Sequence, residues 1–150
     1  MNLFDLRGQV AVVTGSSRGI GRAIAERLAE HGAKVVISSR KQEACEEVAN
    51  AINARHGAGT ALAMAASISN KAALQALIDK TLATFGRIDT LVCNAASNPY
   101  YGSLIDIGDE PFRKILDNNI VANNWLVQMV APQMRARREG SIIIVSSIGG

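Results

Sequence analysis

Several features are scarce in this 150-residue sequence, and their scarcity narrows the classes of protein it can belong to. It has two cysteines, Cys45 and Cys93, without metal-ligand or disulfide spacing, which favours a reducing, cytoplasmic location. No apolar run approaches the roughly 20 residues that span a bilayer. Residues 1–8 contain no long apolar run after basic residues, as a secretory signal would. We therefore expect no membrane segment and no signal peptide.

Excess charge of either sign is also small. Sixteen Lys and Arg residues stand against 13 Asp and Glu, and this net charge of +3 is too small and too scattered to predict a nucleic-acid partner. The chain has no internal repeat and no low-complexity linker. With 48% hydrophobic and 19% charged residues, it is predicted to form one folded domain over residues 1–150.

The most informative stretch is a glycine-rich turn near the N-terminus. An apolar, β-branched run over residues 10–13 is followed by Gly15, Gly19 and Gly21, and then by a helical pattern with Ile20, Ala23, Ile24 and Leu28 on one stripe. Glycines let backbone N–H groups approach a ligand closely, and a helix N-terminus carries partial positive charge. The turn therefore predicts a phosphate site, with a plain strand-to-helix turn as the alternative.

Strand and helix patterns alternate along the whole chain. The expected strands cover residues 10–13, 34–38, 60–66, 89–94 and 141–146. The last helix is expected over residues 112–137, with a kink at Pro132. Its expected apolar face consists of Phe112, Ile115, Leu116, Trp125, Leu126, Met129 and Val130. This alternation predicts a Rossmann-type, doubly wound α/β fold with a parallel sheet in the order 3-2-1-4-5. His31 and His56 are expected to be exposed near helix ends and not to bind metal.

The residues after the second expected strand bear on cofactor choice. A carboxylate at this place selects NAD, and a basic residue accommodates the 2′-phosphate of NADP. The chain has Ser39 and Arg40 here, with no carboxylate before Glu43, and Arg18 lies inside the glycine turn. We therefore predict NADP(H), with two solvated surface arginines as the alternative.

Four motifs resemble the short-chain dehydrogenase/reductase family. Residues 14–21, Thr-Gly-Ser-Ser-Arg-Gly-Ile-Gly, are similar to its cofactor loop, and residues 93–96, Cys-Asn-Ala-Ala, to its Asn-Asn-Ala-Gly segment. Residues 117–120 and 144–148 resemble the segments that carry its active-site Asn and Ser. The resemblance covers the N-terminal three-fifths of a typical member. It implies these cofactor contacts: Thr14, Gly15, Ser17, Arg18, Gly19, Ile20, Gly21, Ser39, Arg40, Ser67, Ile68, Asn94, Ala95 and Ala96.

The resemblance also assigns Asn119 and Ser147 as active-site residues. It implies hydride transfer between the nicotinamide and a carbonyl carbon, with Ser147 bonded to the carbonyl oxygen and Asn119 holding a water. A helix-kinking polar residue and a strand-ending residue are the alternatives for these two positions. The family's Tyr-x-x-x-Lys is absent up to Gly150, because Tyr100 and Tyr101 have no Lys four positions on.

Within the family, residues 39–42, 94–103 and 143–148 look most like the NADPH-dependent carbonyl and retinol reductases. The substrate is then expected to be a ketone, aldehyde or alcohol, in a complete protein that forms homo-oligomers. A 3-oxoacyl-thioester reductase, a non-catalytic NADP(H)-binding module and an assembly fragment are the alternatives. Without the family's later strands and cap, residues 142–145 are expected to form an exposed apolar edge.

Overall fold

The computed structural model describes residues 3–147. Ile148, which ends the predicted active-site serine motif, lies outside the described residues together with Gly149 and Gly150. The strands are β1 (Val10–Thr14), β2 (Lys34–Ser38), β3 (Ala61–Ala63), β4 (Thr90–Cys93) and β5 (Ser141–Ile144). The helices are α1 (Gly19–Glu30), α2 (Gln42–His56), α3 (Lys71–Phe85), α4 (Asp109–Leu116) and α5 (Ala122–Arg137), and a π-helical segment, η1 (Asp117–Val121), joins the last two.

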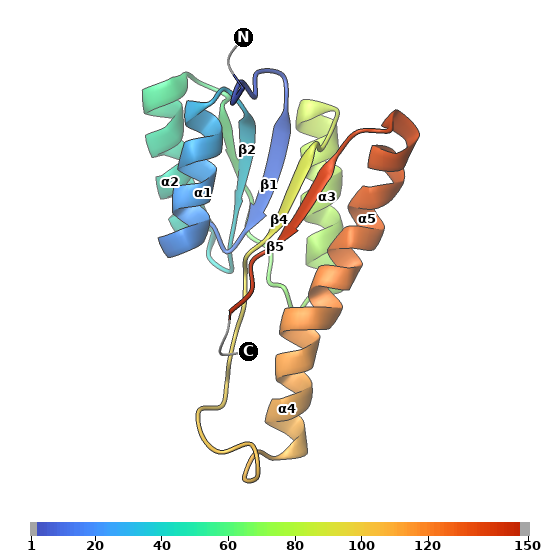
Figure 1. Ribbon diagram of the computed structural model, residues 1–150. Coiled ribbons are helices and arrows are strands. Elements are labelled where there is room, and N and C mark those ends of the chain that lie inside the picture. Colours follow the sequence, from blue (N-terminus) through green and yellow to red (C-terminus); the bar gives the residue numbers. More distant parts are fainter. Residues whose placement is uncertain (1–2, 148–150) are drawn as a thin grey trace.

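The five strands form one parallel sheet in the order β3-β2-β1-β4-β5, which confirms the predicted Rossmann-type fold. Helices α1 and α2 cover one face, and α3 and α5 cover the other (Figure 1). Because the strands are parallel, all their carboxyl ends lie at the same edge of the sheet. The side chains that follow β1, β2, β4 and β5 therefore gather on one side of the molecule.

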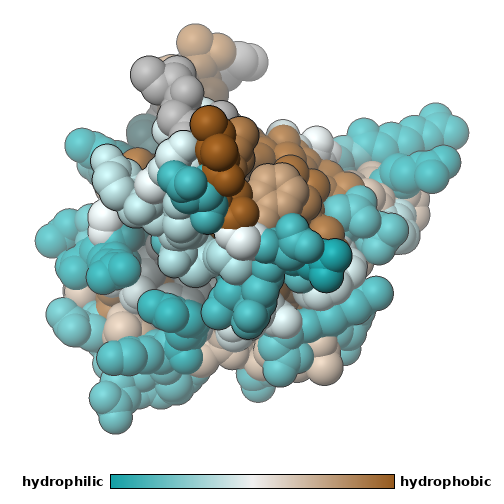
Figure 2. Space-filling view, turned by 90° about the horizontal axis from the view of Figure 1, so that it is seen from below, coloured by the Kyte–Doolittle hydropathy of each residue, from teal (hydrophilic) through white to brown (hydrophobic). Residues whose placement is uncertain are grey.

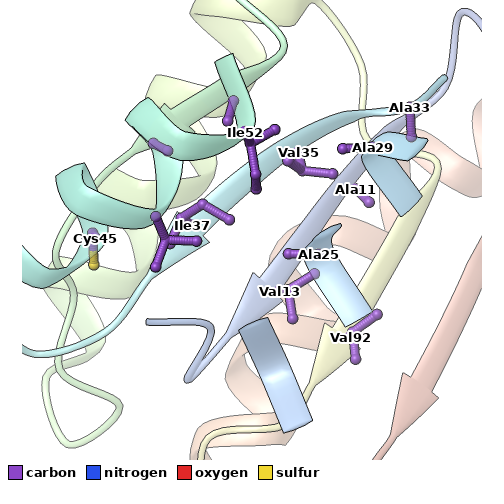
Figure 3. Close-up of a cluster of buried hydrophobic side chains, with 13 residues drawn as sticks. Ala11, Val13, Ala25, Ala29, Ala33, Val35, Ile37, Cys45, Ile52 and Val92 are labelled. Atoms are coloured by element: carbon purple, nitrogen blue, oxygen red, sulfur yellow. The ribbon is translucent and has the colours of Figure 1, made fainter. Parts of the chain in front are cut away.

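Small residues let α1 lie close to the sheet. Its buried positions are Gly21, Ala25 and Ala29, and Figure 3 shows the two alanines among side chains of β1 and β2. The apolar stripe of α1 that was predicted to face the core is only partly buried, because its first residue, Ile20, is 65% exposed. The positions with the smallest side chains, rather than the largest, set how near α1 can come to the sheet.

Several predicted elements differ in extent from those observed: β1 is one residue longer, and β4 is one residue shorter at each end. β3 covers Ala61–Ala63 instead of residues 60–66, and β5 ends at Ile144, because its partner strand β4 ends at Cys93. The long helix begins at Asp109 instead of residue 112. Its α-helical hydrogen bonding is interrupted at Asp117–Val121 and not at Pro132, where the kink was expected and where α5 continues. His31 is exposed as predicted, but His56 is half-buried at the end of α2.

The predicted apolar face of the long helix is buried only in α5. Leu126 and Val130 are fully buried, whereas Phe112 and Leu116 on α4 are 43% and 38% exposed. The reason is that α4 extends beyond the carboxyl edge of the sheet, where no described element covers it (Figure 1). Figure 2 views the molecule from the side of α4 and shows an apolar patch there. The exposed large apolar residues between residues 104 and 120 are Leu104, Ile105, Phe112, Leu116 and Ile120. β5 is exposed along its length, as expected for an apolar edge.

A buried carboxylate, Asp89, joins three elements at the opposite edge of the sheet. Asp89 is 4% exposed, accepts hydrogen bonds from the Arg87 guanidinium and from the Val10 backbone N–H at 2.8 Å, and pairs with Arg137 at 3.3 Å. Burial by itself raises the pKa of Asp89, but the hydrogen bonds from Arg87 and Val10 and the two arginine charges outweigh it, so this pKa lies below its ordinary value. The ionised form of Asp89 therefore stabilises the fold.

We expect Asp89→Asn to lower the free energy of unfolding at pH 7 by about 2–3 kcal/mol, because it removes the buried charge that compensates the half-buried Arg137 guanidinium and the Arg87 guanidinium. Because the folded-state pKa is depressed, this contribution is present above the unfolded pKa, near 3.9, and is lost as pH falls through the folded value. The difference between wild type and variant in urea unfolding should thus shrink below about pH 4. The exposed Asp106→Asn is the control, and a difference that does not vary with pH would contradict the assignment.

Candidate functional site

The glycine turn between β1 and α1 forms the centre of the site. Gly15 and Gly19 have φ angles of +63° and +57°, in the left-handed region that favours glycine. Gly21 has no room for a side chain, because a Cβ there would lie 2.3 Å from the Gly15 carbonyl oxygen and 2.5 Å from Asn94 Nδ2. The first turn of α1 contains no acidic residue, so its N–H groups keep their partial positive charge. The turn thus has the geometry and polarity of an anion cradle.

Thr14 and Asn94, both predicted to contact the cofactor, join the glycine turn to the end of β4. Asn94 Nδ2 donates hydrogen bonds to the carbonyl oxygens of Thr14 and Gly15, each at 3.1 Å. In return, Thr14 Oγ1 accepts from the backbone N–H groups of Asn94 and Ala95, each at 3.0 Å. These bonds fix the turn relative to residues 94–96, of which Ala96 is exposed.

Ser16 is a site residue that the sequence interpretation missed. It is completely buried, and its hydroxyl donates to the Val13 carbonyl at 2.6 Å and accepts from the Ser38 N–H at 2.9 Å. Its own N–H donates to the Ser38 carbonyl at 3.0 Å. Ser16 therefore ties the glycine turn to the end of β2. The sequence signal that could have indicated this role is a small hydroxyl residue directly after Gly15. The residue predicted to contact the cofactor is its neighbour Ser17, which is half-buried.

Two guanidinium groups are accessible at this edge, that of Arg40 directly after β2 and that of Arg18 in the glycine turn. Arg40 and Arg18 are exposed, and among residues 3–147 neither lies within 4 Å of a carboxylate. Ser39 is half-buried, with its hydroxyl 3.2 Å from Cys45 Sγ. Both arginines therefore remain available to an anion at the carboxyl edge of the sheet.

The segment after β3 lies beside the segment after β2. The Ala66 N–H donates to the Ser39 carbonyl at 2.9 Å, which brings the predicted residues Ser67 and Ile68 to the same edge. Ser67 Oγ lies 2.8 Å from Ser69 Oγ, and Ile68 packs against the core on the α3 face. Ser67 thus presents a hydroxyl at this edge.

Asn119 lies in η1 and clamps the loop after β4. Its Nδ2 donates to the carbonyl oxygens of Ser97 at 2.7 Å and Ile115 at 2.8 Å, and its Oδ1 accepts from the Ser97 N–H at 3.1 Å. Both ends of the amide are therefore engaged within the chain. In this geometry the side chain of Asn119 positions the loop after β4, and the active-site role that the resemblance implies for Asn119 stays a prediction.

Ser147 follows β5 and lies at the carboxyl edge of the sheet. β5 pairs with β4 through Ile144 opposite Cys93, and the Val145 N–H donates to the Cys93 carbonyl at 3.0 Å. Ser147 is exposed three residues after the last residue of β5. The nearby Cys93 is not a nucleophile at neutral pH, because burial raises the pKa of its thiol to about 11.

We expect Gly21→Ala to disrupt the cradle. The added methyl group must push the Gly15 carbonyl and the Asn94 amide apart, which should cost about 1–3 kcal/mol of unfolding free energy, as overpacking typically does, and weaken binding of a dinucleotide. Urea unfolding and NADPH fluorescence titration measure the two effects.

Gly108→Ala is the matched control, since a Cβ there meets nothing closer than 3.8 Å and its φ is an ordinary −75°. If Gly21→Ala unfolded and bound NADPH as this control does, the close approach of α1 to Asn94 would not matter.

Comparison with known proteins places this geometry in a family. A sequence model described as short chain dehydrogenase matches residues 9–150. Dehydrogenase/reductase SDR family member 4 of Rattus norvegicus is 42% identical over 146 residues, which are 97% of this chain and 51% of the relative. Tropinone reductase-like 3 of Erythroxylum coca is 39% identical over 143 residues, 95% of this chain and 54% of the relative. The chain thus spans about half the length of these relatives.

Solved structures agree with the sequence relatives. A metagenomic short-chain oxidoreductase in complex with NADP superposes with a TM-score of 0.88 at 39% identity, over 96% of this chain and 64% of that one. A hydroxysteroid dehydrogenase from Escherichia coli superposes with a TM-score of 0.86 at 33% identity, over 96% and 57% of the two chains. Because the family model matches residues 9–150, the chain belongs to the short-chain dehydrogenase family.

Proposed function

We propose that this chain is the NADP(H)-binding region of an oxidoreductase that transfers a hydride between NADP(H) and a ketone, aldehyde or alcohol. One observation carries the choice of cofactor: Arg18 and Arg40 are exposed at the carboxyl edge of the sheet, and neither has a carboxylate partner there. A 2′-phosphate fits such a site, and a guanidinium binds it through two parallel hydrogen bonds. The similar metagenomic oxidoreductase, which was solved in complex with NADP, supports the proposal.

The residues present fit a dinucleotide. A Cβ at Gly15 would lie 2.9 Å from the Ala95 Cα and one at Gly21 2.3 Å from the Gly15 carbonyl oxygen, so these glycines let the turn pack tightly against residues 94–95 and α1. The tight turn places the N-terminus of α1 where a pyrophosphate would bind. Arg40 would hold the 2′-phosphate, Ser67 and Ile68 would lie at the adenine, and residues 94–96 would face the nicotinamide half. The bound cofactor would supply the hydride.

Ser147 is the proposed hydrogen-bond donor to the substrate carbonyl oxygen, and stabilisation of the developing oxyanion is its contribution. We also propose that the complete protein reduces carbonyl groups in the cytoplasm as a homo-oligomer; the name of the dehydrogenase/reductase relatives supports the redox chemistry of this proposal.

Titration of the chain with NADPH and NADH, followed by cofactor fluorescence, tests the proposal. We expect NADPH to bind at least tenfold more tightly than NADH, because only NADPH presents the phosphate to Arg40. Equal affinity for the two, or no binding of either, would contradict it.

A further inference from the structure

Three hydrogen bonds converge on Ser97, a half-buried residue in the loop after β4. Asn119 engages its backbone N–H and C=O, as described above. Asn118 Nδ2 donates to Ser97 Oγ at 2.6 Å, and Asn118 is only 6% exposed. Asn123, one turn further along the helix, donates a hydrogen bond to the Asn119 carbonyl at 2.9 Å. Adjacent asparagines thus bind a single residue of the loop.

The π-helical segment explains how two consecutive side chains reach the same target. In a regular α-helix, residues 118 and 119 would point about 100° apart. The wider turn over Asp117–Val121 changes the direction in which these residues project, and both amides meet Ser97. π-helical turns inside α-helices are frequently found at functional sites.

Ser97 lies three residues after Asn94, whose side chain holds the glycine turn. A continuous set of hydrogen bonds therefore runs from Thr14 and Gly15 through Asn94, along residues 95–97, and into η1. Residues 95 and 96, the proposed floor under the nicotinamide half of the cofactor, are held at both ends. At one end Thr14 accepts from the Ala95 N–H, and at the other the two asparagines hold Ser97.

The geometry assigns Asn118 the role of a positioning residue: through the Ser97 hydroxyl it fixes the backbone of Ala95 and Ala96 for the cofactor. This inference rests on the proposed NADP(H) site. Asn118 is nearly buried and its amide is committed to the protein, so it acts through Ser97. Loss of the bond leaves a half-buried hydroxyl without its partner, while the two Asn119 bonds to the Ser97 backbone remain, so the expected effect is a local loosening of residues 95–97.

The test compares NADPH affinity in Asn118→Ala, Ser97→Ala, the double variant and the conservative Ser97→Thr. We expect each alanine variant to bind NADPH about five- to tenfold more weakly, the size of one hydrogen bond. The double variant should lose no more than either single variant, because both remove the same bond. Ser97→Thr keeps the hydroxyl and should bind as wild type does. Asn124→Ala, the same change at an exposed position of α5, is the control and should have no effect.

Additive losses, or a lower unfolding free energy in Asn118→Ala with unchanged NADPH affinity, would overturn the assignment. Failure of the wild-type chain to bind NADPH would instead contradict the proposed function. Hydrogen exchange of the Ala95, Ala96 and Ser97 amides then still decides the positioning role, since it needs no cofactor. Faster exchange in Asn118→Ala than in Asn124→Ala supports the role, and equal exchange in both contradicts it.

Discussion

Replacing Arg40 with Asp is expected to weaken NADP(H) binding about 100-fold while NAD(H) binding holds or tightens. The 2′-phosphate of NADP(H) carries close to two negative charges, and a hydrogen bond to a charged group contributes about 1.5–3 kcal/mol. The substitution removes that bond and places a carboxylate beside the phosphate, so a repulsion is added to the loss. A total near 3 kcal/mol corresponds to roughly 100-fold in the dissociation constant. With NAD(H), the same carboxylate can accept a hydrogen bond from the free 2′-hydroxyl.

Fluorescence titration of both cofactors against both proteins measures the change in preference. Arg55→Asp is the matched control, because it makes the same change of charge at the far end of α2, where the residue is exposed and no phosphate is proposed. The two variants have the same net charge, so a general electrostatic effect would appear in both. Equal losses of NADP(H) and NAD(H) affinity in Arg40→Asp would show that Arg40 does not select the cofactor.

The arrangement of the sheet could be predicted because local patterns carry it. β-Branched runs such as Lys34–Ser38 alternate with helical stripes that end at glycines, and a parallel, right-handed connection then leaves few possible strand orders. The glycine turn could be located for a similar reason, since Gly15 and Gly19 adopt the left-handed angles that their residue type suggests. These features depend on neighbours in the sequence.

The features that could not be predicted depend on partners distant in the sequence. Asp89 reads as an ordinary residue at the start of a strand, and nothing near it indicates a contact with Arg137, 48 residues away. The exposure of Phe112 and Leu116 is a second example, because their spacing is that of a core-facing stripe and only the position of α4 beyond the sheet leaves them uncovered. Local spacing gives the face of a helix but not what covers it.

Carbonyl reduction by the 150-residue chain alone is expected to be close to background. The proposed site has a hydrogen-bond donor in Ser147, but the sequence contains no Tyr-x-x-x-Lys, the motif that the family resemblance assigns to proton transfer. General acid catalysis contributes about 10²–10⁴-fold, and an open site loses the exclusion of water as well. Tyr100 and Tyr101 are poor substitutes, because the Tyr100 hydroxyl donates to the Ser103 carbonyl at 3.0 Å and Tyr101 is fully exposed. Substantial NADPH oxidation by this chain with small ketones would contradict the expectation and implicate one of these tyrosines.

A chimera separates the contribution of Ser147 from that of the missing acid. The chain matches 51% of the rat dehydrogenase/reductase, so the remaining C-terminal part of that relative can be fused after residue 150. We expect the chimera to oxidise NADPH with small ketones or aldehydes. In the chimera, Ser147→Ala should lower kcat about 10²-fold or more, the typical effect of removing one donor to a developing oxyanion. Its NADPH affinity should stay unchanged, because Ser147 is proposed to contact the carbonyl and not the phosphates. Ser141→Ala, the same change at the exposed start of β5, is the control. If Ser147→Ala weakened NADPH binding and left kcat intact, Ser147 would belong to the cofactor site and the proposed role at the carbonyl would be wrong.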